Sequence, residues 1–186
     1  MTQTTHSSQN NISTRKLTTL SLLSALALVL SWLESVIPFQ PGLPGVKLGL
    51  ANLVIVYVLY QSSVRSALLV NVVRILLAGF LFSGPFGVLY SMAGALTSLA
   101  AMTLLLVLDR KREASGKTEC FSIYGVSMTG GVFHNLGQLI IAILFVSNLN
   151  LFYYFPVMIL SGIAAGILNG IIANLLMQHL PASIQL

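Results

Sequence analysis

Two polar side chains interrupt an apolar stretch of the sequence near its middle. Arg74 lies within this stretch, and Asn71 precedes it by three residues, so an α-helix would place both on one face. An ionisable group at the depth of a bilayer's hydrocarbon costs about 3 kcal/mol or more unless it has a partner, a water-filled cavity or a ligand. Arg74 therefore either pairs with Glu34 or with backbone carbonyls, or binds an anion in a cavity, and we favour the anion.

A second polar group follows the glycine pair at positions 130 and 131. It consists of His134, Asn135 and Gln138, of which His134 and Gln138 share a helical face. These side chains either bind a ligand or join helices through hydrogen bonds, which contribute about 1 kcal/mol each in membranes. We expect no metal site, because no second His, Cys or carboxylate lies near His134 at ligand spacing.

A third pair of polar residues follows a segment rich in proline and glycine. Lys47 ends that segment, and Asn52 lies about one helical turn further on. The pair would place a cation and an amide at an outward-facing mouth. The alternative for Lys47 is an interfacial lysine that extends its amino group to the membrane surface.

The composition indicates which kind of scaffold must position these residues. Of 186 residues, 56% are hydrophobic and only 7% are charged, and the mean hydropathy is +0.91. A water-soluble surface cannot be built from so few charges, so lipid must solvate part of the protein. The net charge of +5 does not indicate a nucleic-acid binder, because the basic residues flank apolar runs instead of forming a stripe.

The distribution of apolar runs predicts an all-α membrane protein with six transmembrane helices. Residues 1–14 are polar and lack apolar periodicity, which predicts a disordered tail. A membrane domain of residues 15–180 follows. Its helices are expected at residues 17–37, 48–60, 64–82, 86–108, 120–146 and 151–178.

Basic residues near membrane segments are retained in the cytoplasm, which predicts the orientation of the chain. Six spans with both termini cytoplasmic leave only Lys47 outside. The cytoplasmic side then holds seven Lys and Arg residues: Arg15, Lys16, Arg65, Arg110, Lys111, Arg112 and Lys117.

Small residues at four-residue spacing mark the first expected helix. Ser21 pairs with Ala25, and Ala27 pairs with Ser31, and such spacing allows a second helix to approach closely. We interpret these positions as a surface that docks a partner subunit, with packing inside the monomer as the alternative.

The sequence contains no motif for catalysis. It has no Gly-Lys-Ser/Thr loop for a nucleotide and no Asp-rich cluster that would hold magnesium and a diphosphate. We therefore expect no enzymatic activity, no catalytic residues and no cofactor in this chain.

Three strings of residues resemble a known family. They are Pro44-Gly45-Val46-Lys47-Leu48-Gly49-Leu50-Ala51-Asn52, the Leu-rich run from Arg74 to Phe82, and Gly125-Val126-Ser127 leading to His134-Asn135-Leu136-Gly137-Gln138. They resemble the Gx transporter family, also described as heptaprenyl diphosphate synthase component I.

This family is similar to the substrate-binding S components of energy-coupling factor transporters. The resemblance implies a multi-pass protein of a prokaryotic cytoplasmic membrane that captures a small, polar or anionic metabolite from outside. It also implies partners, a coupling membrane subunit and two ATPases that use ATP, docked through Ser21, Ala25, Ala27 and Ser31. The substrate pocket would be lined by Lys47, Asn52, Asn71, Arg74, His134, Asn135 and Gln138.

The family's second description implies an alternative. The protein would then be a membrane accessory subunit of heptaprenyl diphosphate synthesis. An isoprenoid or quinone precursor with an anionic head would suit the cationic residues under either interpretation.

Overall fold

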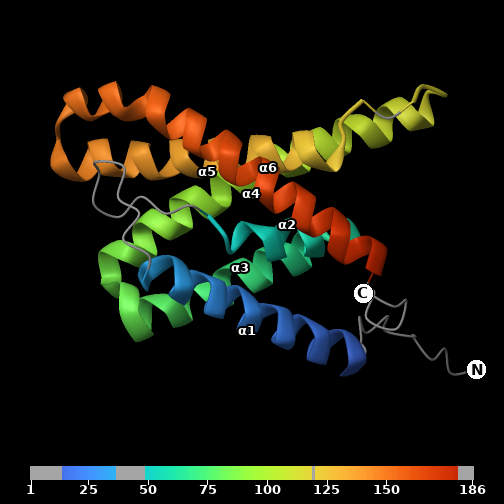
Figure 1. Ribbon diagram of the computed structural model, residues 1–186, viewed down its shortest axis with the longest axis horizontal. Helices are drawn as coiled ribbons and strands as arrows, with labels where there is room; N and C mark the ends of the chain where they lie inside the picture. Colours follow the sequence, from blue (N-terminus) through green and yellow to red (C-terminus); the bar gives the residue numbers. More distant parts are fainter. Residues whose placement is uncertain (1–13, 37–48, 119, 180–186) are drawn as a thin grey trace, which may run out of the picture.

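The computed structural model describes residues 14–36, 49–118 and 120–179, and these residues are almost entirely helical (Figure 1). No β-strand occurs within the described ranges. The polar residues 1–13, the proline-rich segment and Lys47 lie outside the described residues. In chain order the α-helices are α1 (Thr14–Val36), α2 (Asn52–Gln61), α3 (Val64–Ala78), α4 (Gly84–Ala114), α5 (Ile123–Val146) and α6 (Phe155–His179).

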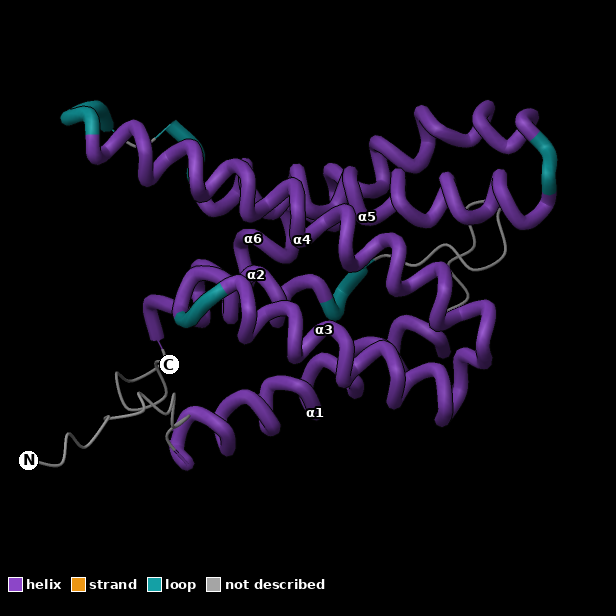
Figure 2. Tube along the Cα trace, turned by 180° about the vertical axis from the view of Figure 1, so that it is seen from behind, coloured by secondary structure: helices purple, strands orange, loops and turns teal. Residues whose placement is uncertain are grey.

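The long helices lie roughly along one axis, and the short α2 lies among them (Figure 2). Helices α5 and α6 form an antiparallel hairpin along one side of the bundle, and α1 packs against α3 along the other. Helix α2 contacts α1, α3 and α6, and also α4 and α5. This arrangement places the start of α2 in the interior.

Four helical stretches are long and apolar enough to cross a membrane: Thr14–Val36, Val64–Ala114, Ile123–Val146 and Leu149–His179. The protein is therefore a multi-pass membrane protein. The 51-residue stretch Val64–Ala114 is not one straight helix, because α3 and α4 fold back on each other at a π-helical turn, Gly79–Ser83 (Figure 1). Glycine permits this reversal: Gly84 has a φ of +66°, and a Cβ at Gly79 would lie 1.9 Å from Val88.

Helix α2 is shorter than the expected segment of residues 48–60. It begins at Asn52, because Gly49 has a φ of +76° and Leu50 and Ala51 form a turn. Every residue from Asn52 to Leu59 is buried, which is typical of a helix surrounded by protein. Ten residues span about 15 Å, half of a hydrocarbon core of about 30 Å.

Helix α4 ends at Ala114, six residues beyond the expected end at Leu108. The charged residues 109–113 continue the helix, because Arg, Lys and Glu are good helix formers and cations stabilise a helix C-terminus. Asp109 is buried, and its carboxylate accepts hydrogen bonds from the N–H groups of Cys120 (2.9 Å) and Phe121 (3.1 Å). This contact fixes the connection that leads into α5.

The start of α5 and the start of α6 also differ from the expected bounds. Helix α5 begins at Ile123 instead of residue 120, because the Ser122 hydroxyl accepts a hydrogen bond from the Gly125 N–H (3.3 Å) and caps the helix. A 3₁₀ turn, Leu149–Tyr154, occupies the place expected for the first residues of the last helix, and α6 follows at Phe155.

Candidate functional site

Arg74 is buried where α3 packs against α1. Its guanidinium donates one hydrogen bond to the Ser31 hydroxyl (3.1 Å) and another to the Asn71 side-chain oxygen (2.7 Å). The carboxylate of Glu34 also interacts electrostatically with Arg74. The expected shared face of Arg74 and Asn71 is confirmed, and the arginine is held by polar groups from both helices.

Glu34 links this arginine to the segment that precedes α2. Its carboxylate accepts a hydrogen bond from the backbone N–H of Gly49. The carbonyl of the same glycine accepts a hydrogen bond from the Asn169 side chain of α6 (3.0 Å). The start of α2 is therefore tied to α1 on one side and to α6 on the other.

The His134 ring lies between the same glycine and α4. A Cβ at Gly49 would be 3.8 Å from the ring, and a Cβ at Gly94 would be 2.9 Å from it. Only glycine at position 94 leaves room for the imidazole in this position. His134 is thus brought beside the chain that connects Glu34 to Asn169.

Asn52 extends the polar contacts to α4 and α5. The Ser98 hydroxyl donates a long hydrogen bond of 3.4 Å to the Asn52 side-chain oxygen, and the Asn52 amide nitrogen would lie 3.1 Å from a Cβ at Gly130. We call the connected residues the polar centre, and each of them is more than nine-tenths buried. They are Ser31, Glu34, Asn52, Asn71, Arg74, Ser98, His134 and Asn169.

Several buried polar atoms in and near the polar centre make no hydrogen bond with the described residues. Both amide atoms of Gln138 are in this state, although the side chain is only 1% exposed and lies one turn after His134. The same holds for the Asn52 nitrogen and the Asn169 oxygen. Since buried polar groups nearly always have a partner, these atoms have the capacity to bind a polar molecule.

The structure separates one expected substrate-binding residue, Asn135, from the polar centre. Asn135 donates hydrogen bonds to the Met158 carbonyl (2.8 Å) and the Ser161 hydroxyl (3.0 Å), which places it in the α5–α6 contact. These hydrogen bonds join α5 to α6, which is the interhelical alternative to ligand binding for Asn135. Lys47 lies outside the described residues.

The four small residues of α1 lie on two different faces. Ser21 and Ala25 are exposed, whereas Ala27 and Ser31 are 0% and 2% exposed. Ser31 accepts a hydrogen bond from Arg74, so its hydroxyl serves the polar centre. A partner subunit can reach only Ser21 and Ala25 in this conformation, because the other two positions are covered by the chain itself.

Two residues of the polar centre were not singled out from the sequence. Ser98 has no distinctive signal, because serine is common in membrane helices. Asn169 has a stronger signal, since it is an amide between Gly166 and Gly170 in the otherwise apolar stretch of residues 162–173. An interior amide flanked by glycines is typical of a position where helices approach closely and share a hydrogen bond.

The site suits recognition rather than metal chemistry. Among the described residues, no group of three or more His, Cys, Asp or Glu side chains could hold a metal ion. The polar centre combines one guanidinium, one carboxylate, one imidazole and several amides. Such groups orient a polar or anionic molecule through hydrogen bonds and charge.

The fold and the site together define the class of this protein. It is a helical, multi-pass membrane protein with hydrogen-bonding side chains in its interior. The chain belongs to the family described as heptaprenyl diphosphate synthase component I, whose family model matches residues 23–176. The matched region contains the whole polar centre. No curated protein and no solved structure matches the chain.

Proposed function

We propose that this protein is the substrate-binding S component of an energy-coupling factor transporter for a small polar or anionic metabolite. The observation that carries the proposal is the polar centre, which gathers buried hydrogen-bonding groups from all six helices inside a lipid-embedded bundle. Lipid makes such groups costly, so a solute-binding role gives them a physical reason. The chain itself supplies binding, and partner ATPases supply the energy.

The chemistry of the polar centre suggests the class of substrate. The carboxylate of Glu34 interacts electrostatically with Arg74, so the polar centre does not require a strongly anionic ligand. The polar centre also offers amides and an imidazole. A small molecule with a carboxylate, phosphate or several hydroxyl groups suits these groups. The uncommitted amide of Gln138 provides both a donor and an acceptor for it.

The proposed topology has six crossings with both termini in the cytoplasm of a prokaryote. The start of α1 and the end of α6 lie at the same end of the bundle (Figure 1), which supports an even number of crossings. Helix α2 would belong to the second crossing, although its ten residues alone are too short to span the hydrocarbon core. The excess of basic residues at the cytoplasmic loops favours this orientation.

The proposed docking surface for the coupling subunit is the exposed face of α1 around Ser21 and Ala25. Ser21 donates its hydroxyl proton to the Leu17 carbonyl (2.9 Å) within the helix, so this face offers no unsatisfied polar group. Leu22, Leu26 and Val29 are exposed on the same helix. A small-residue surface flanked by apolar side chains suits close packing against another membrane helix.

Ala25→Trp is expected to abolish association with the coupling subunit and its ATPases. An indole on this face would hold the partner helix away, and the fold would be retained because Ala25 is exposed. The measurement is recovery of those subunits with tagged protein expressed in its native host. Ala164→Trp is the matched control, since Ala164 is an exposed small residue on α6, and it should not change the recovery.

The same purification tests the second candidate function, an accessory subunit of heptaprenyl diphosphate synthesis. The description of the chain's family favours this candidate. Recovery of a prenyl diphosphate synthase subunit in place of ATPases would support it and would contradict the transporter proposal. Undiminished recovery of the coupling subunit with Ala25→Trp would contradict the docking surface alone.

A further inference from the structure

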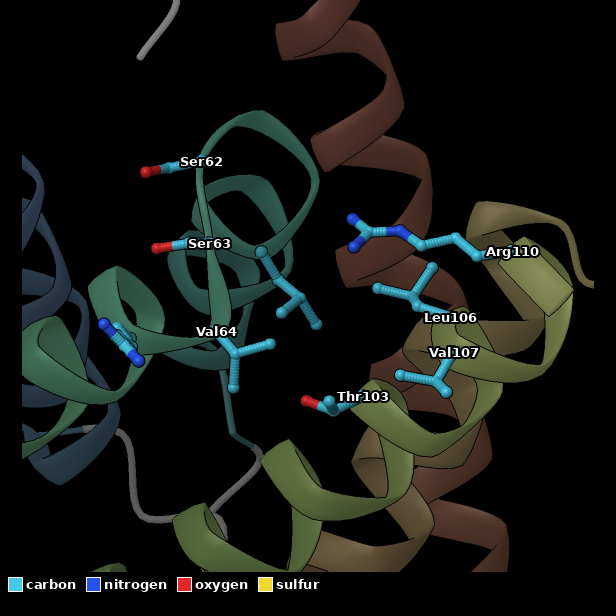
Figure 3. A pocket seen from close by; sticks show the side chains of 9 residues that line it. Ser62, Ser63, Val64, Thr103, Leu106, Val107 and Arg110 are labelled. Carbon is cyan, nitrogen blue, oxygen red and sulfur yellow. The ribbon is translucent and has the colours of Figure 1, made fainter. Parts of the chain in front are cut away.

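A cavity away from the polar centre lies where the α2–α3 turn faces α4. Its volume is about 450 Å³. Figure 3 shows Thr103, Leu106 and Arg110 extending from α4 beside the turn that carries Ser62, Ser63 and Val64. The cavity is also lined by Leu59, Arg65 and Val107. It therefore combines two cations with an apolar wall.

The charge around this cavity has one sign. Arg65 and Arg110 are its charged lining residues, both are exposed, and no acidic side chain lines it within the described chain. Helix α3 begins at Val64 on its rim, and the Ser63 hydroxyl caps the N–H of Ser66 (3.2 Å). The N–H groups of Val64 and Arg65 still lack an intrahelical acceptor, and the helix dipole favours an anion there. These features together select a negatively charged group.

The remaining lining residues favour a ligand that carries an apolar tail beside its negatively charged group. Leu59, Leu106 and Val107 form an aliphatic wall. Val107 is 40% exposed, and Leu104, about one turn earlier on α4, is 58% exposed. The cavity thus adjoins the lipid-facing side of α4 and reaches the first of the charged residues that end this helix. Thr103 adds a buried hydroxyl oxygen that makes no hydrogen bond with the described residues.

We propose that this cavity binds the phosphate head group of an anionic membrane phospholipid, with the acyl chain along the aliphatic wall. The Arg110 guanidinium suits a phosphate, because arginine binds phosphate oxygens through a planar fork of donors, and Arg65 adds a second positive charge to the lining. The proposal depends on the cavity alone and holds whichever metabolite the polar centre binds.

The test compares lipids that differ only in head-group charge. Native mass spectrometry of the detergent-solubilised protein would measure binding of phosphatidylglycerol and of phosphatidylcholine with the same acyl chains. We expect saturable binding of phosphatidylglycerol and much weaker binding of phosphatidylcholine. Replacing both Arg65 and Arg110 by alanine should weaken phosphatidylglycerol binding about 30-fold, from the contribution of two arginines near a membrane surface.

Two variants separate the cavity from general surface charge. Arg112→Ala removes the same charge from the same helix but outside this cavity, and it should leave phosphatidylglycerol binding nearly unchanged. Thr103→Phe keeps every charge but fills the cavity, and it should reduce binding as strongly as the double arginine variant. A thermal melt of each variant would establish that the fold is intact.

Three outcomes would overturn the proposal. Equal binding of the two lipids would show that charge does not select the occupant. Equal losses for Arg110→Ala and Arg112→Ala would show diffuse attraction to a basic surface. Displacement of the lipid by an equimolar amount of inorganic phosphate would show that the site takes a free anion instead of a lipid head group.

Discussion

Gly131→Ala is expected to destabilise the helix bundle by about 3 kcal/mol, at the upper end of the cost of overpacking a well-packed interior. A Cβ at this position would lie 2.2 Å from the carbonyl oxygen of Gly162 and 3.3 Å from the backbone nitrogen of Gly166. Both contacts are with backbone atoms of α6, which cannot move aside as a side chain can. Helices α5 and α6 would have to separate along their shared length.

The measurement is thermal unfolding of the purified protein in detergent, with Gly125→Ala as the matched control on the same helix. A Cβ at Gly125 would meet only the Ser122 hydroxyl oxygen, at 3.8 Å. Removing a helical glycine there should stabilise the protein by up to about 1 kcal/mol. The two substitutions are thus expected to have opposite signs, and equal effects would contradict the close α5–α6 contact.

Glu34→Gln is expected to destabilise the protein by about 3 kcal/mol, because it leaves the buried charge of Arg74 without its carboxylate. Glutamine retains an oxygen that can accept the hydrogen bond from the Gly49 N–H, so the loss reports mainly on charge. Arg74→Met should be similarly costly, since it removes a buried cation that interacts electrostatically with the carboxylate of Glu34. Neither group can reach water readily, as each is only 7% exposed.

The double variant Glu34→Gln/Arg74→Met provides the decisive comparison. If the two side chains compensate each other, it should be more stable than the sum of the single losses predicts, by at least about 1 kcal/mol. Unfolding of all four proteins by denaturant in detergent would give the coupling energy. Additive losses would show that Arg74 is stabilised by Ser31 and Asn71 without Glu34.

Helical periodicity predicted the local part of the site from the sequence. The spacing of three residues placed Asn71 and Arg74 on one face, and the structure joins them by a hydrogen bond of 2.7 Å. The hydrophobic runs likewise predicted a helical membrane protein, because the length and apolar composition of each run indicate by themselves a helix that can cross a membrane. These are properties of single segments.

Contacts between distant segments could not be predicted in this way. The hydrogen bond from Asn169 to the Gly49 carbonyl joins residues 120 positions apart, and nothing in either segment alone specifies it. Spacing also cannot tell which face of a helix points inward. For this reason Ala27 and Ser31 matched a docking pattern as well as Ser21 and Ala25, although they are buried within the chain.

The ends of the helices depend on helix propensity and backbone conformation, which a hydrophobicity profile does not contain. The charged residues after Leu108 extend α4 through their helix propensity, and the left-handed conformation of Gly49 delays the start of α2. The reversal between α3 and α4 is similar, because it depends on the close approach of Gly79 to Val88. The start of α2 and the reversal between α3 and α4 are each decided by one or two residues, and the end of α4 is decided by a charged segment.

The central claim is that the polar centre binds a small molecule, and Gln138→Leu tests it most directly. Both amide atoms of Gln138 make no hydrogen bond with the described residues, so leucine, which is close in size, should preserve or raise the thermal stability of the ligand-free protein. Gln178→Leu, at the exposed end of α6, is the control.

Native mass spectrometry of gently purified protein is the measurement. We predict that the unmodified protein and Gln178→Leu retain the same small molecule, and that Gln138→Leu remains folded but loses it. A folded Gln138→Leu protein that retains the molecule undiminished, or an unmodified protein that retains none, would contradict a solute-binding role for the polar centre.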